Sequence, residues 1–318
     1  MVEVKNLVKR YGDKLAVNNV SFSVGEGEIL GFLGPNGAGK STTMNIITGY
    51  LSSTSGTVTI DGCEILEDPK GAKSKIGYLP ELPPLYQDMT VKRYLEFVYD
   101  LKKVTLPRQE HLAEVCKVTK ITDVYNRVIK NLSKGYRQRV GLAQALIGNP
   151  PVIILDEPTV GLDPKQIIEM RNLIRGLGKK HTVILSSHVL SEIQAVCDRI
   201  VVINEGKLVA DENTESITTS FSGVKRIQLH IDGNENVILP ALRGVDGVTR
   251  VRKVMRTIDG FGEYIVESSA DVDIRRGVFN TMAKISCPIV MMRNAEMSLE
   301  DAFLRITSGE TSAKGGKK

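Results

Sequence analysis

The chain has 318 residues, of which 42% are hydrophobic and 25% charged, a balance typical of a folded globular protein rather than a disordered or fibrous one. Its length predicts two domains, and a net charge of +5 without a long basic run outside the extreme tail does not favour a nucleic-acid-binding surface. No apolar run is long enough to cross a bilayer and no apolar signal segment begins the chain, so we expect a cytoplasmic protein.

The four cysteines lie far apart in the sequence. They form no Cys-x-x-Cys pair and no cluster with histidine, which excludes the usual spacing of a structural zinc site. We therefore expect reduced, mostly buried thiols in a reducing compartment. The cysteines are Cys63, Cys116, Cys197 and Cys287.

The first thirty residues alternate apolar and polar side chains, with a turn at Gly12-Asp13, and predict short strands of a mostly antiparallel layer. Residues 28–33 form a compact apolar run typical of a buried strand, and residues 40–48 have a helical pattern. A glycine-rich loop between a strand and a helix is the context of a phosphate-binding loop. This loop reads Gly34-Pro35-Asn36-Gly37-Ala38-Gly39-Lys40-Ser41.

The loop predicts a site for nucleotide phosphates. Its glycines allow backbone N–H groups to approach phosphates closely, and the following helix directs its positive N-terminus at them. Lys40 would reach the β- and γ-phosphates, Ser41 would ligate Mg²⁺, and Thr42 would add a phosphate contact. A glycine-rich turn can match this pattern by chance, but the flanking strand and helix argue against chance here.

The rest of the first two thirds of the chain predicts an α/β fold. Residues 57–60 read as a further strand, and residues 90–148 have helical spacing. From residue 150 apolar strands alternate with helices, which predicts a parallel sheet with helices on both faces. The strands are expected at 152–155 and 183–185, and the helices at 167–177 and 189–196.

Two acids and a histidine follow strands of this predicted sheet. Asp156 and Glu157 end one buried strand, and His188 follows another. Ligands of α/β sheets bind at the carboxyl edge of the strands, so these side chains are candidates for a site beside the phosphate loop. Taken alone, the acids would also fit a solvated strand end, and the histidine a structural role.

The composition shifts to threonine and serine at residues 212–223, where we place a boundary between domains at 1–215 and 224–308. Residues 309–318 are expected to form a flexible basic tail. In the second domain the order strand, helix, strand, strand, helix, strand predicts a small α+β ferredoxin-like fold, followed by a helix. The expected elements are Val224–Ile231, Val237–Leu242, Val248–Met255, Tyr264–Glu267, Ile274–Ala283, Pro288–Met292 and Leu299–Ile306.

A third motif lies between the phosphate loop and the paired acids, where residues 132–138 read Leu-Ser-Lys-Gly-Tyr-Arg-Gln. The three motifs in this order resemble the ATP-binding-cassette family, the ATPase subunits of ABC transporters, over about residues 1–215. The resemblance implies a P-loop NTPase fold of the ABC-cassette type, with a mixed sheet core, an antiparallel β subdomain and a helical subdomain at about 85–148. It also implies a dimer, because the family's Leu-Ser-Gly-Gly-Gln motif completes the ATP site of a second subunit.

The resemblance implies catalytic roles at a site for ATP and Mg²⁺. By this resemblance Glu157 is the general base that polarises the attacking water. His188 contacts the γ-phosphate and orders that water, and Asp156 holds Mg²⁺ through water. Lys40 and Glu81 complete the implied catalytic set.

The resemblance also implies contacts around the nucleotide. Tyr11 stacks on adenine, although a tyrosine packed at a turn would fit the sequence as well. Ser133 and Gly135 hold the γ-phosphate bound to the opposite subunit. Asp163 belongs to the D-loop, which lies between the two ATP sites of the dimer.

The chain departs from the family pattern at two motifs. Lys134 and Tyr136 stand where the signature has glycine and glutamine, and Glu81 stands where the Q-loop has a glutamine that contacts Mg²⁺ and water. These departures resemble the ABC-2-type exporter branch, and we expect the Glu81 carboxylate still to supply an oxygen to the metal. Residues 82–99 would form part of the groove for a membrane partner, unless they are an ordinary loop and surface helix.

The leading hypothesis is therefore a transport motor that binds ATP as a homodimer or with a paired nucleotide-binding subunit, and drives a separate membrane permease from the cytoplasmic face. A soluble ABC ATPase acting on ribosomes or nucleic acid is the alternative, and the single cassette without a coiled-coil insertion argues against it. A regulatory binding module is a third, which the intact Glu157 and His188 argue against. Arg137 and Arg139 are expected to face solvent or the dimer seam rather than nucleic acid.

Overall fold

The computed structural model describes residues 2–214, 224–254, 261–269 and 271–295. Its internal contacts divide the chain into two compact units, Met1–Thr214 and Glu215–Lys318. Each unit has its own hydrophobic core, and each is described by itself below.

The first unit begins with a four-stranded antiparallel sheet in the order β2-β1-β4-β5. Alternate side chains of its strands are buried, as the sequence alternation predicts. β1 and β2 are joined by the tight turn at Gly12, so that Tyr11 pairs with Lys14 across the hairpin. The strands are β1 (Val2–Tyr11), β2 (Lys14–Val24), β4 (Ser55–Ile60) and β5 (Cys63–Glu64).

A six-stranded sheet forms the centre of this unit, in the order β10-β9-β3-β8-β7-β6. The strands from β9 to β6 are parallel to their neighbours, and β10 pairs antiparallel with β9 at one edge. β3, β7 and β8 are buried along their whole length, which explains their continuous apolar runs. The strands are β3 (Ile29–Leu33), β6 (Ile76–Leu79), β7 (Val152–Asp156), β8 (Thr182–Ser187), β9 (Arg199–Asn204) and β10 (Lys207–Asn213).

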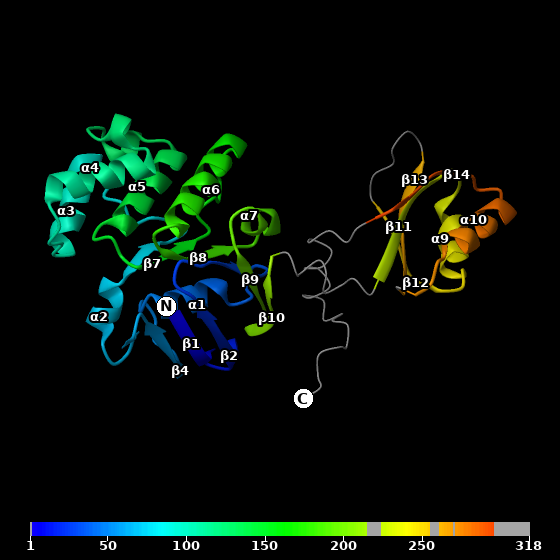
Figure 1. The fold of residues 1–318 in the computed structure, drawn as a ribbon, viewed down its shortest axis with the longest axis horizontal. Coiled ribbons are helices and arrows are strands. Elements are labelled where there is room, and N and C mark those ends of the chain that lie inside the picture. The colour runs from blue at the N-terminus through cyan, green and yellow to red at the C-terminus, as the bar shows by residue number, and fades with distance from the viewer. Residues whose placement is uncertain (1, 215–223, 255–260, 270, 296–318) are drawn as a thin grey trace. The chain divides into compact units, whose positions relative to one another are not determined.

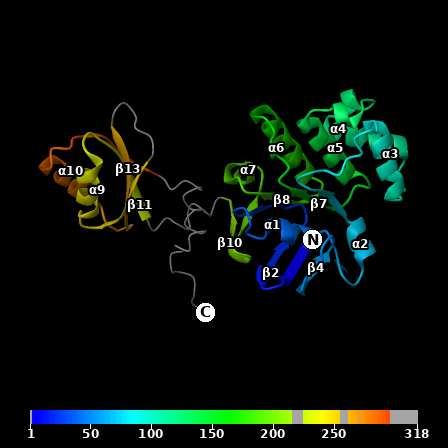
Figure 2. The same ribbon diagram turned by 180° about the vertical axis from the view of Figure 1, so that it is seen from behind.

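Helices cover both faces of the central sheet (Figures 1 and 2). α1 and the antiparallel sheet lie on one side, whereas α5 and α6 lie on the other. The core on the α1 side joins the two sheets through Leu7, Phe32, Met44 and Ile154, all fully buried. The helices are α1 (Lys40–Ile47), α2 (Pro69–Ser74), α3 (Val91–Leu101), α4 (Arg108–Thr119), α5 (Lys134–Leu146), α6 (Pro164–Gly178) and α7 (Leu190–Gln194).

The helices begin at residues that satisfy their free N–H groups. The Thr90 hydroxyl accepts a hydrogen bond from Arg93 N at the start of α3, and the Asp163 carboxylate accepts one from Gln166 N at the start of α6. Because Asp163 caps α6 and Pro164 is its first residue, that helix starts three residues before the predicted 167–177 range. α7 is shorter than the predicted 189–196 range.

The second unit has the order β11-α9-β12-β13-α10-β14 and one antiparallel sheet in the order β12-β13-β11-β14. This is the ferredoxin-like arrangement, so the predicted α/β cassette with a small α+β domain is the correct fold class. The predicted helix 299–306 and the tail 309–318 lie outside the described residues. The elements are β11 (Val224–Ile231), α9 (Glu235–Arg243), β12 (Val248–Lys253), β13 (Gly262–Ser269), α10 (Arg275–Lys284) and β14 (Ile289–Asn294).

The two faces of this small sheet differ in chemistry. Leu229, Tyr264 and Val266 are buried in the core that also contains residues of α9 and α10. The opposite face carries charged side chains, among them the buried ion pair between Arg226 and Glu267. The second unit therefore has a complete core within its own elements.

Candidate functional site

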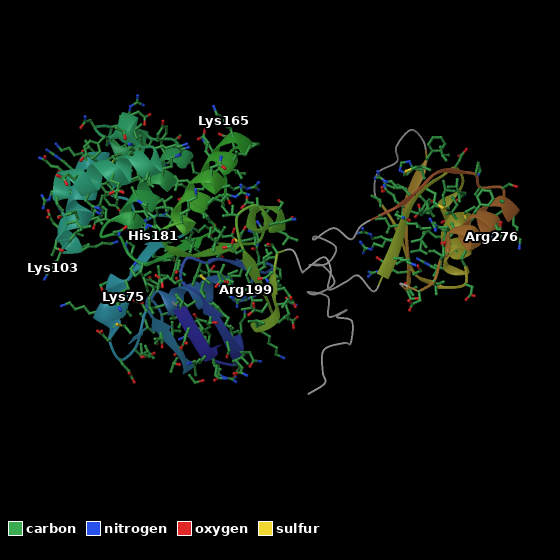
Figure 3. The ribbon with its side chains drawn as sticks, viewed as in Figure 1. Lys75, Lys103, Lys165, His181, Arg199 and Arg276 are labelled. Atoms are coloured by element: carbon green, nitrogen blue, oxygen red, sulfur yellow. The ribbon has the colours of Figure 1, made fainter. Side chains whose placement is uncertain are left out.

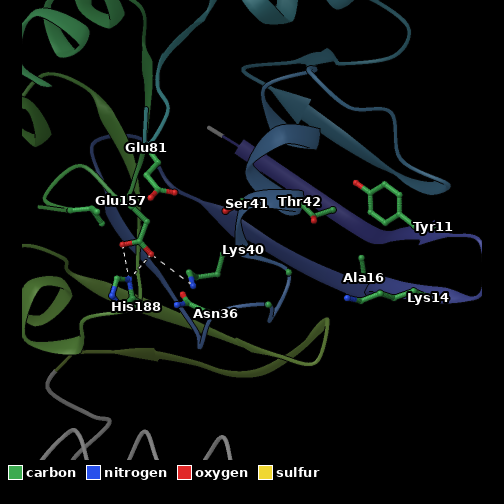
Figure 4. Close-up of a pocket in the computed structure, with 13 residues that line it drawn as sticks. Tyr11, Lys14, Ala16, Asn36, Lys40, Ser41, Thr42, Glu81, Glu157 and His188 are labelled. Carbon is green, nitrogen blue, oxygen red and sulfur yellow. Dashed lines mark hydrogen bonds and ion pairs between the residues drawn. The ribbon is translucent and has the colours of Figure 1, made fainter. Parts of the chain in front are cut away.

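A cavity of roughly 710 Å³ opens where the carboxyl ends of the parallel strands meet the loop after β3. Figure 4 shows its wall, with Glu157 and His188 at one end and Tyr11 at the other. Among the described residues that line it are Tyr11, Lys14, Ala16, Asn36, Gly37, Gly39, Lys40, Ser41, Thr42, Glu81, Glu157, Val160 and His188.

The glycine-rich loop takes a shape that side chains at two positions would prevent. Gly39 caps α1 with a φ of 109°, in the left-handed region. A Cβ on Gly34 would lie 2.3 Å from the carbonyl oxygen of Ile203, so the loop passes directly against β9. The loop thus presents backbone N–H groups and the N-terminus of the eight-residue helix α1 to one place, an arrangement suited to phosphate.

Lys40, at the start of α1, is buried and already has partners. Its Nζ donates hydrogen bonds to the carbonyl oxygens of Gly34, at 2.7 Å, and Pro35, at 3.2 Å, and lies 3.8 Å from Glu157 Oε1. Burial lowers the pKa of Lys40, and the nearby charge of Glu157 opposes that shift. A phosphate entering the loop would replace the carbonyl contacts with a charged one.

Glu157 and His188 form a direct pair at the carboxyl edge of β7 and β8. His188 Nδ1 lies 2.9 Å from both carboxylate oxygens of Glu157. Glu157 has a φ of 49°, and its N–H donates to Ser186 O at 3.0 Å, which holds the turn against β8. Burial raises the pKa of Glu157, and the hydrogen bond with His188 and the charge of Lys40 partly offset the rise. This is the environment of a carboxylate that can accept a proton.

Asp156 and Ser41 fit a magnesium ion. Asp156 is 4% exposed, its pKa is raised chiefly by burial, and its Oδ1 has no hydrogen-bond partner. Ser41 follows Lys40 at the start of α1 and lines the cavity, and its hydroxyl is close enough to Asp156 to lower the pKa of that carboxyl. A buried carboxylate oxygen and a hydroxyl are hard oxygen ligands of the kind that Mg²⁺ takes together with phosphate and water. Among the described residues no group of three or more His, Cys, Asp or Glu side chains could hold a metal by itself.

The open end of the cavity is made by the β1–β2 hairpin. Tyr11 is 48% exposed, and the Lys9 ammonium lies 5.2 Å from its ring centre. Lys14 and Ala16 of β2 line the same end and are absent from the predicted site. The hairpin could have predicted them, because it pairs Lys14 with Tyr11. Val160, beside Glu157, is a third lining residue that the sequence reasoning missed.

The predicted signature and D-loop residues lie outside this cavity. Ser133 caps α5 and accepts a hydrogen bond from Tyr136 N at 3.4 Å, and Asp163 caps α6. Gly135 is buried against α6, where a Cβ would lie 2.6 Å from Gln166 Oε1. Within one chain these residues do not line the cavity that contains Lys40 and Glu157. A role toward the site of a second subunit would require this separation. Gly34, Pro35, Ala38 and Asp156, which the sequence also predicts for the site, are not among the residues that line the cavity.

Glu81 reaches the cavity from the segment after β6. Its carboxylate raises the pKa of Asp156 by charge repulsion, so the two acids are close enough to interact. Its main-chain oxygen accepts a hydrogen bond from Gln138 Nε2 of α5, at 3.2 Å. The position therefore connects the candidate metal site with the helix that carries the signature motif.

Other basic groups are placed away from the site (Figure 3). His181 is buried at the start of β8, with its Nδ1 2.8 Å from Pro150 O, so it has a structural role. Lys75 follows α2 and Lys103 follows α3, whereas Arg199 begins β9 and is paired with Glu28 and Asp211.

The expectation that Arg139 faces solvent is wrong, and its place at the dimer seam stays a prediction. Its side chain is 13% exposed, and it forms an ion pair with Glu169 of α6. Arg139 therefore joins α5 to α6, because the packing of the two helices encloses a side chain that the helical pattern alone would leave outside.

This fold carries a phosphate loop, a pair of acids at the carboxyl edge of the sheet, and a signature helix with an N-terminal cap. Together these features define an ATP-binding cassette. The ABC transporter family matches residues 17–160. The chain is 40% identical over 234 residues to the uncharacterized ABC transporter ATP-binding protein YhcH of Bacillus subtilis (strain 168), covering 71% of this chain and 76% of that protein. It is 31% identical over 321 residues to the bacitracin transport ATP-binding protein BcrA of Bacillus licheniformis, covering 98% of each. The chain belongs to the ATP-binding proteins of ABC transporters.

Solved structures agree with this assignment. The cassette MJ0796, in a dimeric post-hydrolysis state bound to ADP and Pi, is similar with a TM-score of 0.62 and 29% identity, over 67% of this chain and 99% of that one. The protein is thus an ATPase subunit of an ABC transporter. Among the described residues, no helix is both long and apolar enough to cross a membrane.

We expect the pKa of Glu157 to lie above the ordinary glutamate value of 4.5 in the nucleotide-free protein, because burial disfavours its charged form. In His188→Ala the midpoint should rise further, because the lost hydrogen bond favoured the carboxylate. Carbon-13 NMR of labelled glutamate carboxyls, with Glu157→Gln for assignment, measures both midpoints. A midpoint at or below 4.5 would contradict the burial argument.

Glu81→Gln should keep ATPase activity within about threefold of wild type, because an amide oxygen can replace the carboxylate oxygen and one repulsive charge near Asp156 is lost. Glu81→Ala, which removes the oxygen, should lose more. Steady-state phosphate release over a range of Mg²⁺ concentrations checks this. An inactive Glu81→Gln variant would show that the position needs its negative charge.

Proposed function

We propose that this ABC transporter ATPase powers an exporter, working as a closed dimer on a separate membrane permease. The observation that carries the proposal is the pairing of a buried Glu157 with His188 beside the phosphate loop. That pair supplies a proton acceptor where a terminal phosphate would lie, which a regulatory binding module would not need.

The proposed site is shared between two chains. In one chain the cavity would hold the triphosphate along Lys40, Ser41 and Thr42, with the base near Tyr11. Ser133, at the exposed start of α5, would donate to the terminal phosphate of the other chain. ATP binding would then draw the two chains together, and hydrolysis would release them.

Each residue near the reacting phosphate has a distinct proposed role. Glu157 accepts the proton of the attacking water, and His188 holds both that carboxylate and the terminal phosphate. Asp156 and Ser41, with Glu81, would hold Mg²⁺, which neutralises charge on the phosphates. Lys40 would exchange its carbonyl partners for phosphate oxygens.

Export as the direction of transport rests on two observations. A relative with 34% identity, from Burkholderia orbicola (strain AU 1054), is named for Nod factor export, and relatives with 31% and 36% identity are named for transport of bacitracin and of a lantibiotic. Lys134, Tyr136 and Glu81 are departures of the kind found in the ABC-2-type exporter branch. The permease would select the substrate.

The permease is proposed to dock beside Glu81. A second cavity of roughly 270 Å³ is lined there by Glu81, Leu82, Pro83 and Gln138, among others. Leu82 is 78% exposed, and Tyr86 contacts Phe97 of α3 with ring centres 5.4 Å apart. Exposed apolar groups beside a small cavity are typical of a surface that a partner covers. Because Glu81 lines both cavities, permease docking and nucleotide binding would both involve this residue.

The alternative of a soluble ABC ATPase on ribosomes or nucleic acid has less support. The relatives reported above are named as ATP-binding proteins of transporters, not for action on ribosomes or nucleic acid. The second unit is proposed to support dimerisation or regulation, because its buried groups form no catalytic constellation among the described residues.

Glu157→Gln should bind ATP and form a stable dimer, while its turnover falls by roughly 10²- to 10⁴-fold, because the amide cannot accept a proton. Size-exclusion chromatography with ATP, together with phosphate release, measures both properties. The matched variant Glu157→Gln with Ser133→Ala should bind ATP without the stable dimer. A Glu157→Gln protein that stays monomeric with ATP would contradict the shared site.

Affinity purification of the tagged chain from gently solubilised native membranes should recover a polytopic membrane protein in stoichiometric amount. The double variant Leu82→Asp with Tyr86→Asp should lose it and keep basal ATPase activity, because charge would be placed in the docking surface. Tyr50→Asp, which alters an exposed aromatic residue elsewhere, is the control. Recovery of ribosomes or nucleic acid in place of a membrane protein would support the alternative.

A further inference from the structure

A buried carboxylate makes hydrogen bonds to the two segments that carry Glu157 and His188. Glu192 lies on α7, is 8% exposed and is not among the residues that line the nucleotide cavity. Its Oε2 accepts hydrogen bonds from the hydroxyls of Thr159 and Ser187, the second at 3.4 Å. Both hydroxyl residues are themselves buried.

The two partners of Glu192 belong to the two segments that carry the catalytic groups. Thr159 is two residues after Glu157, in a turn closed by a hydrogen bond from Val160 N to Glu157 O at 3.2 Å. Ser187 directly precedes His188, and its hydroxyl also accepts a hydrogen bond from Val189 N at 3.0 Å. The contact between Glu157 and His188 connects these two segments directly. Glu192 therefore makes a second connection between the same segments.

We propose that Glu192 is a positioning residue for ATP hydrolysis, which fixes the Glu157 segment to the His188 segment through Thr159 and Ser187. The inference rests on the roles proposed above for Glu157 and His188. It adds a residue that touches neither nucleotide nor water but sets the separation of the two groups that do.

The chemistry of the contact supports this role. A carboxylate removed from water needs hydrogen-bond donors, and hydroxyl donors to a carboxylate make stronger bonds than neutral pairs do. Glu157 has a left-handed backbone conformation, which persists only where neighbouring contacts hold it. The Thr159 turn also leads directly into Asp163 and α6, so the link joins His188 to the segment expected to meet the second subunit.

The test uses the purified full-length chain and steady-state ATPase kinetics. Glu192→Ala should lower kcat by about tenfold or more and leave the KM for ATP within about twofold, because the phosphate loop is untouched and only the catalytic pair loses its spacing. Glu192→Gln, which keeps an oxygen to accept from Thr159, should recover most of kcat. Gln194→Ala, at an exposed position of the same helix, should match wild type.

A purely structural Glu192 would give a different result. A folded Glu192→Ala protein with kcat within about threefold of wild type, or a KM that rises as kcat falls, would overturn the proposal. Thr159→Ala and Ser187→Ala each remove one of the two hydrogen bonds to Glu192, and each should lower kcat. These variants keep the test valid if Glu192→Ala does not fold.

Glu157→Gln in the same assay separates this proposal from the proposed catalytic roles. Full turnover there would remove the catalytic roles themselves, whereas an inactive Glu157→Gln beside a normal Glu192→Ala would remove only the positioning role.

Discussion

The carboxylate of Glu157, buried between Lys40 and His188, is the contact on which the rest of the site depends. Three parts of the fold must meet for it to form: the loop after β3, the end of β7 and the end of β8. Parallel pairing brings these ends to one edge, and burial of the strands fixes them there. The energetic cost of burying the acid is offset by its two partners, so the contact also requires the nearby cation and histidine.

Much of this arrangement follows from local sequence. Residues 28–33 and 152–155 are apolar runs too short for helices, and the glycine loop and acid pair stand directly after them, so their place in the site could be predicted. The order of elements in the second unit could also be predicted, because each has its own periodicity and turn residues. The start of α6 lies three residues before the predicted range, because the cap at Asp163 and Pro164 add its first turn.

What local sequence could not provide is contact between distant segments. The pattern of α7 marks Glu192 only as an acid in a short helix, and its link to Thr159 exists only when β7 and β8 are adjacent. The enclosure of Arg139 by α6 has the same origin. Lys14 and Ala16 enter the cavity wall because a hairpin places them beside Tyr11. In each case the missing information is which surface a helix or hairpin packs against.

The hydrogen bonds of Lys40 to Gly34 and Pro35 have a consequence for the working cycle. The ammonium has two carbonyl partners within its own loop, so phosphate would exchange these partners rather than meet an unpaired charge. Nucleotide gains only the difference between phosphate and carbonyl contacts, which moderates affinity. When the product leaves, the same carbonyls can accept the ammonium again, so release does not leave a buried cation without hydrogen-bond partners. A motor that must release its spent nucleotide on every cycle benefits from such an exchange.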